Sequence, residues 1–417
     1  MSGESVEPDE IGMSGESGEP DGIGTSGKFR EPKGSGTQKR AELTKSDGLA
    51  QEEMNEEQLL AVRSVSPAIT VIAGPGTGKT KTLVSRILYL SQNRRVKPSE
   101  ITAVTFTNQA AREIRTRLEE KLGKRSMAGR IRMGTFHSIC YRLLKASGKE
   151  FVLAEEDMVR ELVKDATEEL GISGRSKTLR QKISIRKVEL AEQGAKEEAA
   201  VQERSKTDQL LLRYQEKLAA LGAWDFDDLM IQALRMAREG APAFPYLLVD
   251  EFQDISPLQY RLLQAWSRGG REVFIIGDPD QAIYGFRGAD CESFLRFCQE
   301  ENAETIRLRK NYRSSPEILG VSERILLNGG IFFGGILEEG RIPLDPVQKS
   351  GLPVRMVQAV GAREEAVFIA KEINRLIGGI DMLDVQEGFA CADHRSPRSF
   401  ADIAVLYRTH RQAELLE

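Results

Sequence analysis

The stretch from Ala68 to Gln92, "AITVIAGPGTGKTKTLVSRILYLSQ", decides the fold. Its opening residues, "AITVIAG", are apolar or β-branched and predict a buried strand, whereas "KTKTLVSRILYLSQ" has the spacing of an amphipathic helix. The glycine-rich turn between them allows backbone N–H groups to surround phosphate oxygens, and the start of the helix adds partial positive charge. The stretch therefore predicts a phosphate-binding loop between a strand and a helix of an α/β domain.

The loop itself supplies the residues that such a site needs. Lys79 is placed to reach the β- and γ-phosphates of ATP, and the Thr80 hydroxyl to coordinate Mg²⁺. The first position of the pattern is alanine instead of glycine, and a glycine-rich turn without a ligand is the alternative. The predicted ATP-binding residues of the loop are Ala73, Gly74, Pro75, Gly76, Thr77, Gly78, Lys79 and Thr80.

Further strands follow the same alternation of β and α segments. "ITAVTF" (101–106), "FPYLLVD" (244–250) and "EVFIIGD" (272–278) are short apolar runs, as expected for parallel strands buried on both faces. Two carboxylates, Asp250 and Glu251, follow the second of these runs, where the carboxyl ends of strands form a ligand crevice. We expect Asp250 to hold the metal ion and Glu251 to position the attacking water, although an Asp-Glu pair after a strand can also be a helix cap.

Composition shifts divide the chain into segments. Residues 1–48 form a degenerate repeat rich in Gly, Ser, Pro and Glu, which predicts a disordered tail. Residues 147–223 read as long charged helices without strands, and they interrupt an α/β domain of residues 49–146 and 224–306. Residues 307–417 resume the alternation with only two clear strands, "PVRMVQA" (353–359) and "FADIAVLYR" (400–408), which predicts an incomplete second α/β domain.

Bulk properties exclude some classes of protein. The net charge of −4 arises in the tail, so electrostatic attraction to a partner must come from local patches. The four cysteines match neither a zinc spacing nor a disulfide framework, which favours reduced thiols in a cytoplasmic protein. The most apolar stretch, residues 325–337, has 13 residues and is too short to span a bilayer, so no membrane partner is expected.

Seven stretches together resemble the motifs of the UvrD/Rep/PcrA group of superfamily 1A DNA helicases, from about Leu49 to the C-terminus. They occur in the order of that family: "NEEQLLAV", "AGPGTGKT", "AVTFTNQAAREI", "GTFHSICYRLL", "VDEFQDISPLQ", "GDPDQAIYGFRGAD" and "LRKNYRSSPEIL". The resemblance implies a RecA-like P-loop NTPase sheet with an all-helical insertion and an incomplete second RecA-like domain. It also implies an ATP-hydrolysing 3′→5′ helicase or translocase that uses ATP and Mg²⁺.

The resemblance assigns roles around the nucleotide to residues outside the loop. Gln58 would hydrogen-bond the adenine edge, since its amide both donates and accepts, and Tyr312 would stack on the base. Gln281 would sense the γ-phosphate and link it to the DNA side. Arg313 would act as an arginine finger, although a salt bridge at a helix start is the alternative. With Lys79 and Glu251, Gln281 and Arg313 make up the predicted catalytic set.

For single-stranded DNA, the resemblance implies aromatic stacking platforms with polar residues along the backbone path. The predicted DNA-binding residues are Phe106, Asn108, His137, Tyr284, Phe286 and Arg287. Phe286 stands where the family usually has Trp, so stacking on a base is expected to be weaker. Gln109 stands where the family usually has Lys, so one possible phosphate contact is expected to be lost. Any of these rings could instead belong to the core.

A basic run, "GRSKTLRQKISIRK" (Gly174 to Lys187), has six bases and no acid. It is either a face that binds a nucleic-acid backbone or a solvated helix face. In the first case, neutralising Lys177, Arg180 and Lys182 should flatten the salt dependence of DNA binding.

In the family, the second motor domain continues beyond a stretch such as "DIAVLYRTHRQ" with two further motifs. The resemblance therefore predicts weak unwinding by this chain alone, and one reading is that a partner chain supplies the missing part. Three functions stay open from sequence: a motor acting on single-stranded and partially duplex DNA, an ATP-gated single-strand clamp, and an inactive remnant.

Overall fold

The computed structural model describes residues 54–122, 128–193, 205–240, 244–282, 292–328, 343–378 and 398–416. The predicted disordered tail over residues 1–48 lies outside the described residues, and so do Tyr284, Phe286 and Arg287. No helix within the described ranges is both long and apolar enough to cross a membrane. Cys140 and Cys298 are free thiols.

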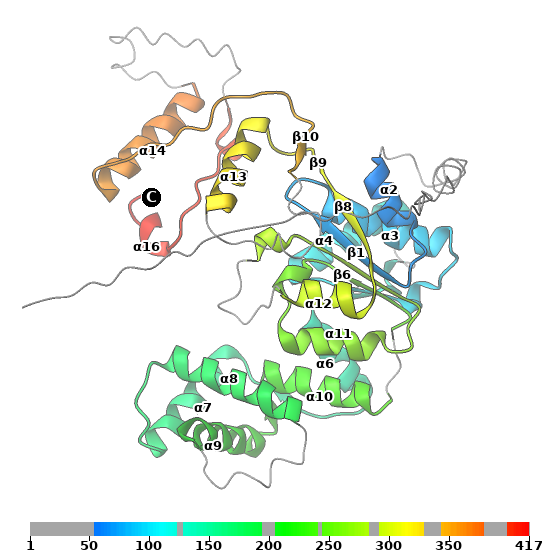
Figure 1. The fold of residues 1–417 in the computed structure, drawn as a ribbon. Coiled ribbons are helices and arrows are strands. Elements are labelled where there is room, and N and C mark those ends of the chain that lie inside the picture. Colours follow the sequence, from blue (N-terminus) through cyan, green and yellow to red (C-terminus); the bar gives the residue numbers. More distant parts are fainter. Residues whose placement is uncertain are drawn as a thin grey trace, which may run out of the picture. The chain divides into compact units, whose positions relative to one another are not determined.

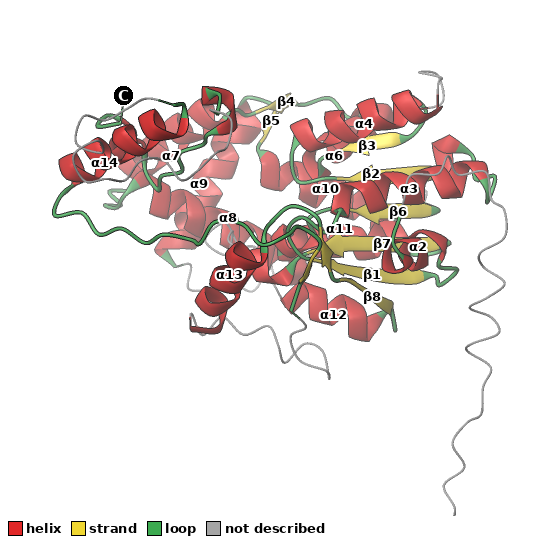
Figure 2. Ribbon diagram, turned by 90° about the horizontal axis from the view of Figure 1, so that it is seen from above, coloured by secondary structure: helices red, strands yellow, loops and turns green. Residues whose placement is uncertain are grey.

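A parallel six-stranded sheet forms the centre of the α/β domain, with strand order β3-β2-β6-β7-β1-β8 (Figure 2). Every neighbouring pair runs parallel, as the continuous apolar runs predicted. The strands are β1 (Ala68–Ala73), β2 (Ile101–Val104), β3 (Arg132–Gly134), β6 (Tyr246–Val249), β7 (Glu272–Gly277) and β8 (Glu304–Leu308). The doubly covered α/β class expected from the sequence is confirmed.

Helices cover both faces of this sheet (Figure 1). One face carries α2 (Glu56–Arg63), α3 (Lys79–Gln92) and α4 (Asn108–Leu122), and the other α6 (Phe136–Ala146), α10 (Phe226–Arg238), α11 (Pro257–Ser267) and α12 (Glu292–Glu300). The second group buries one core with alternate strand residues such as Val104, Leu247 and Ile275. Because side chains alternate along a strand, the intervening buried residues, including Ala103, Leu248 and Ile276, face α3 and α4.

Three short 3₁₀ helices lie next to strands of this sheet, one before β2 and the other two after β6 and β7. They are η1 (Pro98–Glu100), η2 (Phe252–Asp254) and η3 (Pro279–Gln281). The last two follow β6 and β7, so they lie at the carboxyl edge of the sheet, where the predicted site is.

A buried ion pair fastens α2 to the sheet. The Arg86 side chain is fully buried, and its Nε donates to Glu272 Oε1 at 2.9 Å. Its Nη1 donates to the carbonyls of Val62 at 2.6 Å and Ser64 at 2.8 Å. Because a buried guanidinium needs partners for its donors, the end of α2 is held next to α3.

The predicted helical insertion consists of α7 (Glu156–Glu169), α8 (Ser176–Gln193) and α9 (Lys206–Ala220). These helices share a core of their own, built around Val163, Ile183 and Tyr214. The expectation of no strand in this region was wrong in one detail: β4 (Val152–Leu153) pairs in parallel with β5 (Ala223–Trp224). This two-residue ladder joins the segment that enters the helical insertion to the segment that leaves it.

Beyond β8 the described elements are β9 (Lys310–Asn311), α13 (Pro316–Asn328), β10 (Asp345–Pro346), α14 (Ala362–Leu376), η6 (Phe400–Asp402) and α16 (His410–Ala413). The predicted strands at 353–359 and 400–408 were wrong, since neither segment is assigned as a strand. Met356 and Leu406 are 99% and 93% exposed. An apolar run becomes a strand only when a neighbour completes its hydrogen bonds, and no described segment does so for either run.

Candidate functional site

The predicted phosphate loop connects β1 to α3 as the sequence indicated, with Lys79 as the first residue of the helix. Gly76 and Gly78 have φ of +71° and +91°, the left-handed region that glycine adopts without strain. Thr77 is fully buried, and its hydroxyl donates to the Gly74 carbonyl at 2.7 Å, which tightens the turn. No side chain in the described part of the chain caps the N-terminus of α3, so its first N–H groups suit an anion.

The two carboxylates after β6 lie next to this loop. Lys79 Nζ lies 3.2 Å from Glu251 Oε2, although the two residues are 172 positions apart in the chain. Asp250 is 7% exposed, and its backbone N–H donates to Val104 O at 2.9 Å, which continues the sheet to this residue. Strand ends on either side of β7 thus bring a cation and two carboxylates together.

Electrostatics around Asp250 suit a cation. Burial, and then the neighbouring charge of Glu251, raise the pKa of Asp250 to about 7. Asp250 Oδ1 is buried and finds no hydrogen-bond partner among the described residues. A carboxylate oxygen of this kind is a good ligand for Mg²⁺, which prefers oxygen donors. Thr80, half-buried at the second position of α3, is the other predicted ligand.

Two more acids with perturbed pKa values lie at the same edge. The pKa of Asp254 is raised to about 6 by burial and by Glu251, and the pKa of Asp278 is raised to about 6 by burial. Asp278 lies directly after β7, and its Oδ2 accepts a hydrogen bond from Gln281 Nε2 at 2.7 Å. Gln281 is among the residues predicted from the sequence, whereas Asp254 and Asp278 are not.

Gln58 is held against the phosphate loop. Its side chain is 2% exposed, and Nε2 donates to the Thr77 carbonyl at 2.9 Å. Its Oε1 accepts from the Asn55 N–H at 3.2 Å in a capping box at the start of α2. A Cβ at Gly78 would approach Gln58 Nε2 to 2.7 Å, so the glycine makes room for this amide. Gln58 therefore shapes the loop, and its predicted contact to adenine stays a prediction.

The segment with Tyr312 and Arg313 also touches the loop. The Tyr312 N–H donates to Gly76 O at 2.9 Å, and the Tyr312 hydroxyl accepts from Asn55 Nδ2 at 3.0 Å. Fully buried Asn311 donates to Pro75 O and accepts from the Arg313 N–H at 3.0 Å. The backbone of the predicted arginine finger is thus attached to the loop that would hold the phosphates.

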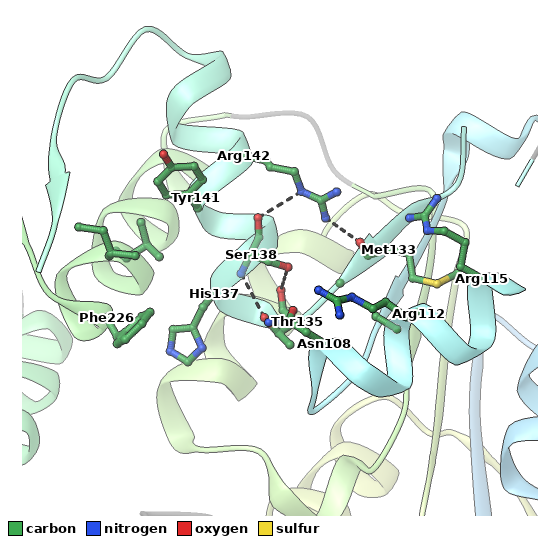
Figure 3. Close-up of a pocket in the computed structure, with 14 residues that line it drawn as sticks. Asn108, Arg112, Arg115, Met133, Thr135, His137, Ser138, Tyr141, Arg142 and Phe226 are labelled. Atoms are coloured by element: carbon green, nitrogen blue, oxygen red, sulfur yellow. Dashed lines mark hydrogen bonds between the residues drawn. The ribbon is translucent and has the colours of Figure 1, made fainter. Parts of the chain in front are cut away.

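A groove of about 540 Å³ opens beside β3 and gathers two of the predicted DNA contacts (Figure 3). Asn108 and His137 line it, whereas Phe106 is half-buried and is not among the lining residues. Its lining is Asn108, Ala111, Arg112, Arg115, Met133, Gly134, Thr135, His137, Ser138, Tyr141, Arg142, Leu153, Phe226 and Leu229. Three arginines and no acid make this surface cationic.

The arginines are held close to one another. Arg142 Nη2 donates to Met133 O at 2.8 Å, and Arg115 Nη1 donates to Ala128 O at 3.4 Å. Burial and the nearby charge of Arg115 lower the pKa of Arg142. An anion in the groove would relieve this repulsion, since an opposite charge favours the charged form of each guanidinium.

An exposed ring lies on the same groove. Phe226, the first residue of α10, is 46% exposed and meets His137 edge to face at 4.9 Å between ring centroids. Burial lowers the pKa of His137, which favours its neutral form near pH 7. Arg112 and Arg115 follow Asn108 at helical spacing on α4, a signal that sequence reasoning missed. Phe226 carried no such signal.

Most of the basic run belongs to α8, and its six bases have different environments in the structure. Lys187 is buried and pairs with Asp225 at 2.6 Å and Asp228 at 2.8 Å, so it lies neither on a nucleic-acid face nor on a solvated face, the two alternatives for the run. Arg186 pairs with Asp208 and Glu189, and Arg180 with Glu156. The three remaining bases, Arg175, Lys177 and Lys182, are exposed.

Sequence comparison agrees with this architecture. The family described as "UvrD/REP helicase N-terminal domain" matches residues 54–302, and "UvrD-like helicase C-terminal domain" matches residues 306–417. The chain is 31% identical over 385 residues to the ATP-dependent DNA helicase PcrA of Staphylococcus epidermidis (strain ATCC 35984), which covers 88% of this chain and 49% of that protein.

A second relative gives the same result. The ATP-dependent DNA helicase PcrA of Staphylococcus aureus (strain Mu50) is 30% identical over 383 residues, 87% of this chain and 49% of the relative. The chain thus spans about half the length of the curated relatives it matches. With the matched residues covering the sheet, the helical insertion and the segments beyond β8, the chain belongs to the UvrD/Rep family of helicases.

Proposed function

We propose that this chain hydrolyses ATP in response to single-stranded DNA and uses the energy to move on that strand, in the 3′→5′ direction that the family resemblance implies. Its substrates would be ATP with Mg²⁺, and DNA with a single-stranded region. The observation that carries the proposal is the contact between Lys79 and Glu251 at 3.2 Å, with Asp250 beside them. A phosphate-binding lysine, a metal-binding carboxylate and a residue that positions the attacking water recur in enzymes that transfer a phosphoryl group to water, and the second carboxylate suits the last of these roles.

Each residue of this set would have its own task. Lys79 and the N–H groups of the loop would hold the β- and γ-phosphates, which would compete with Glu251 for the lysine. Glu251 would then be free to orient a water molecule and accept its proton. Arg313, whose backbone is attached to the loop through Asn311, would stabilise charge on the transferred phosphoryl group.

Thr80 and Asp250 would hold the magnesium ion. When bound, this ion would neutralise charge on the phosphate oxygens. Magnesium keeps several water ligands and usually takes only one or two from the protein, so two side chains are sufficient. The buried, unpartnered Oδ1 of Asp250 supports this assignment.

DNA would lie in the cationic groove beside β3. Arg112, Arg115 and Arg142 would contact phosphates, and the exposed face of Phe226 would stack on a base. Asn108 and neutral His137 would add hydrogen bonds. This path is independent of the basic run on α8, in which three of the six bases pair with acids.

Steady-state ATP hydrolysis, with and without a single-stranded oligonucleotide, tests the proposal. The wild-type protein should show DNA-stimulated turnover, and Lys79→Ala should lower kcat by about 100-fold or more, because a preorganised charge at the transferring phosphate is lost. Lys164→Ala is the matched control, since Lys164 is exposed and pairs with Glu168 at 3.8 Å on the same helix.

Other outcomes select other functions. DNA binding that depends on ATP but occurs without turnover would favour a clamp. Turnover that is equal in the wild type and in Lys79→Ala would show that the phosphate loop is not the site of hydrolysis.

A further inference from the structure

One buried amide joins the ends of β6 and β7 at the proposed ATP site. Gln253 is 2% exposed and belongs to η2, directly after the two carboxylates. Its Nε2 donates to Glu251 Oε2 at 2.8 Å, and its Oε1 accepts from the Asp278 N–H at 2.9 Å. A single side chain therefore contacts the proposed catalytic carboxylate and the strand end that leads to Gln281.

The chemistry of the partners fixes the orientation of this amide. An ionised carboxylate can only accept a hydrogen bond and a backbone N–H can only donate, so the two ends of the Gln253 side chain cannot be exchanged. A glutamine in this orientation satisfies Glu251 without bringing a second positive charge next to Lys79. Among side chains that are neutral near pH 7, an amide thus supplies both the donor and the acceptor that the bridge needs.

Local packing makes room for the bridge. Gly277, the last residue of β7, lies beside it, and a Cβ at this position would collide with Gln253 Oε1 and approach Phe252 N to 2.9 Å. Glu251 has φ of +49°, a left-handed conformation that is uncommon for a residue with a side chain. The backbone at this turn is thus held in an unfavourable conformation, as expected where a side chain must point in one direction.

From Asp278 the contacts continue to Gln281. Asp278 is 4% exposed, and its Oδ2 accepts from Gln281 Nε2 at 2.7 Å, while its Oδ1 accepts from the Asp280 N–H at 3.1 Å. Glu251 Oε2, at the other end, also accepts from Lys79 Nζ. An unbroken series of contacts therefore runs from the phosphate-loop lysine to the predicted γ-phosphate sensor.

We propose that Gln253 is a positioning residue for ATP hydrolysis. It holds the Glu251 carboxylate in place when phosphate oxygens compete for Lys79, and it couples the orientation of Glu251 to Gln281. This inference rests on the proposed function, because it assumes that Glu251 acts on a water molecule at a bound triphosphate. The sequence alone predicts no role for Gln253.

Two substitutions of similar size test the bridge. Gln253→Glu keeps an oxygen for the Asp278 N–H but loses the donor to Glu251, and Gln253→Met loses both contacts. Each should lower kcat for DNA-stimulated hydrolysis by about 10- to 100-fold, since a small misplacement of a catalytic group has effects of this size. Nucleotide affinity, measured with a fluorescent ATP analogue, should change by less than about threefold, since phosphate binding depends on the loop. Gln181→Glu, at an exposed position of α8, is the matched control.

A pH profile separates positioning from a purely structural role. In Gln253→Glu two carboxylates are in contact, which favours proton uptake by the introduced side chain as pH falls, and this side chain can then again donate to Glu251. The kcat of this variant relative to wild type should therefore rise as pH falls from about 8 to about 6. The double variant with Gln281→Ala should lose less than the product of the two single effects, because the residues act in one network.

The outcomes are distinct. If the kcat of Gln253→Glu equals that of the wild type at every pH, the inference is overturned. It is also overturned if the variant loses nucleotide affinity and thermal stability together with activity. Wild-type protein without DNA-stimulated turnover overturns the proposed function itself, and this inference with it. Turnover in the wild type with no effect of either substitution overturns only the role of Gln253.

Discussion

Lys79 Nζ and Glu251 Oε2 are 3.2 Å apart across the end of β7, and this contact places the phosphate loop and the acidic pair in one site. Both side chains are partly accessible, with 13% and 34% of their side-chain surface exposed. An ion pair of this accessibility adds little to stability. Its value is geometric, because it keeps the carboxylate beside the lysine that would bind the phosphate oxygens.

Replacing the carboxylate by its amide tests this geometry. Glu251→Gln keeps the size of the side chain but cannot accept a proton from water, so kcat should fall by about 10²- to 10⁴-fold. Nucleotide affinity should be kept or increased, because Lys79 no longer pairs with a competing charge. Single-turnover hydrolysis and analogue titration measure the two effects, and Glu216→Gln, at an exposed position of α9, is the control. Hydrolysis at the wild-type rate would exclude Glu251 as the base.

The raised pKa of Asp250 predicts a stability that depends on pH. Its folded pKa of about 7 lies above the usual value of 3.8, so proton binding favours the folded state at low pH. This contribution is complete below about pH 4 and is lost as pH rises through 7, when a buried charge must form. Asp250→Asn removes the titration, so its gain in Tm over wild type should grow from pH 4 to pH 8, by several degrees.

Magnesium should act against this difference in Tm, because it should stabilise the wild type. At pH 8 the ion should raise the Tm of the wild type but not that of Asp250→Asn, because a ligand that binds only the folded state stabilises it. Differential scanning fluorimetry with and without MgCl₂ measures both, and Asp157→Asn, an exposed acid on α7, is the control. Equal Tm values for wild type and Asp250→Asn across this pH range would contradict the buried charge.

Lys187 joins the helical insertion to α10 through buried charges. Burial lowers the pKa of Lys187, but the carboxylates of Asp225 and Asp228 outweigh this effect and leave it raised. The Tyr214 hydroxyl also donates to Asp225 Oδ2, at 2.8 Å. Lys187→Met should lower the free energy of unfolding by about 3–5 kcal/mol, because two buried carboxylates lose their cation.

Two variants identify the cause of that loss in urea unfolding. Lys182→Met, on the exposed side of α8, should have little effect. Adding Asp225→Asn to Lys187→Met should restore part of the stability, since it removes one unpaired charge and asparagine still caps α10. A double variant less stable than the single one would show that packing, not charge, is what Lys187 contributes.

The central part of the fold could be predicted from sequence because its signals are local. A strand, a glycine loop and a helix in immediate succession have few alternatives, and the stretch from Ala73 to Thr80 runs from the end of β1 into the start of α3, as predicted. Asp250 and Glu251 were also placed correctly at the end of a buried strand. Their proximity to Lys79 followed from one general property of parallel sheets, that strand ends share an edge.

What the sequence could not show depends on partners distant in the chain. Lys187 read as one more base in a basic run, and only the folded structure pairs it with Asp225. The runs at 353–359 and 400–408 have the composition of strands, yet composition does not supply the neighbouring strand that a ladder requires. Phe226 gave no signal because an exposed aromatic residue looks the same in sequence as one in the core.

DNA binding in the groove and DNA binding on α8 predict different effects of substitutions on the salt dependence of DNA affinity. Arg112 is exposed and lines the groove, so Arg112→Gln should remove about one phosphate contact and reduce the slope of log K against log salt by about 0.7. Lys177→Gln combined with Lys182→Gln removes two exposed charges from α8, and it should change the slope less if the groove is the main path. Fluorescence anisotropy with a labelled oligonucleotide between about 50 and 200 mM salt measures both slopes. A larger change from the α8 variants than from Arg112→Gln would move the proposed DNA path from the groove to the helical insertion, because each lost contact releases its own share of counterions.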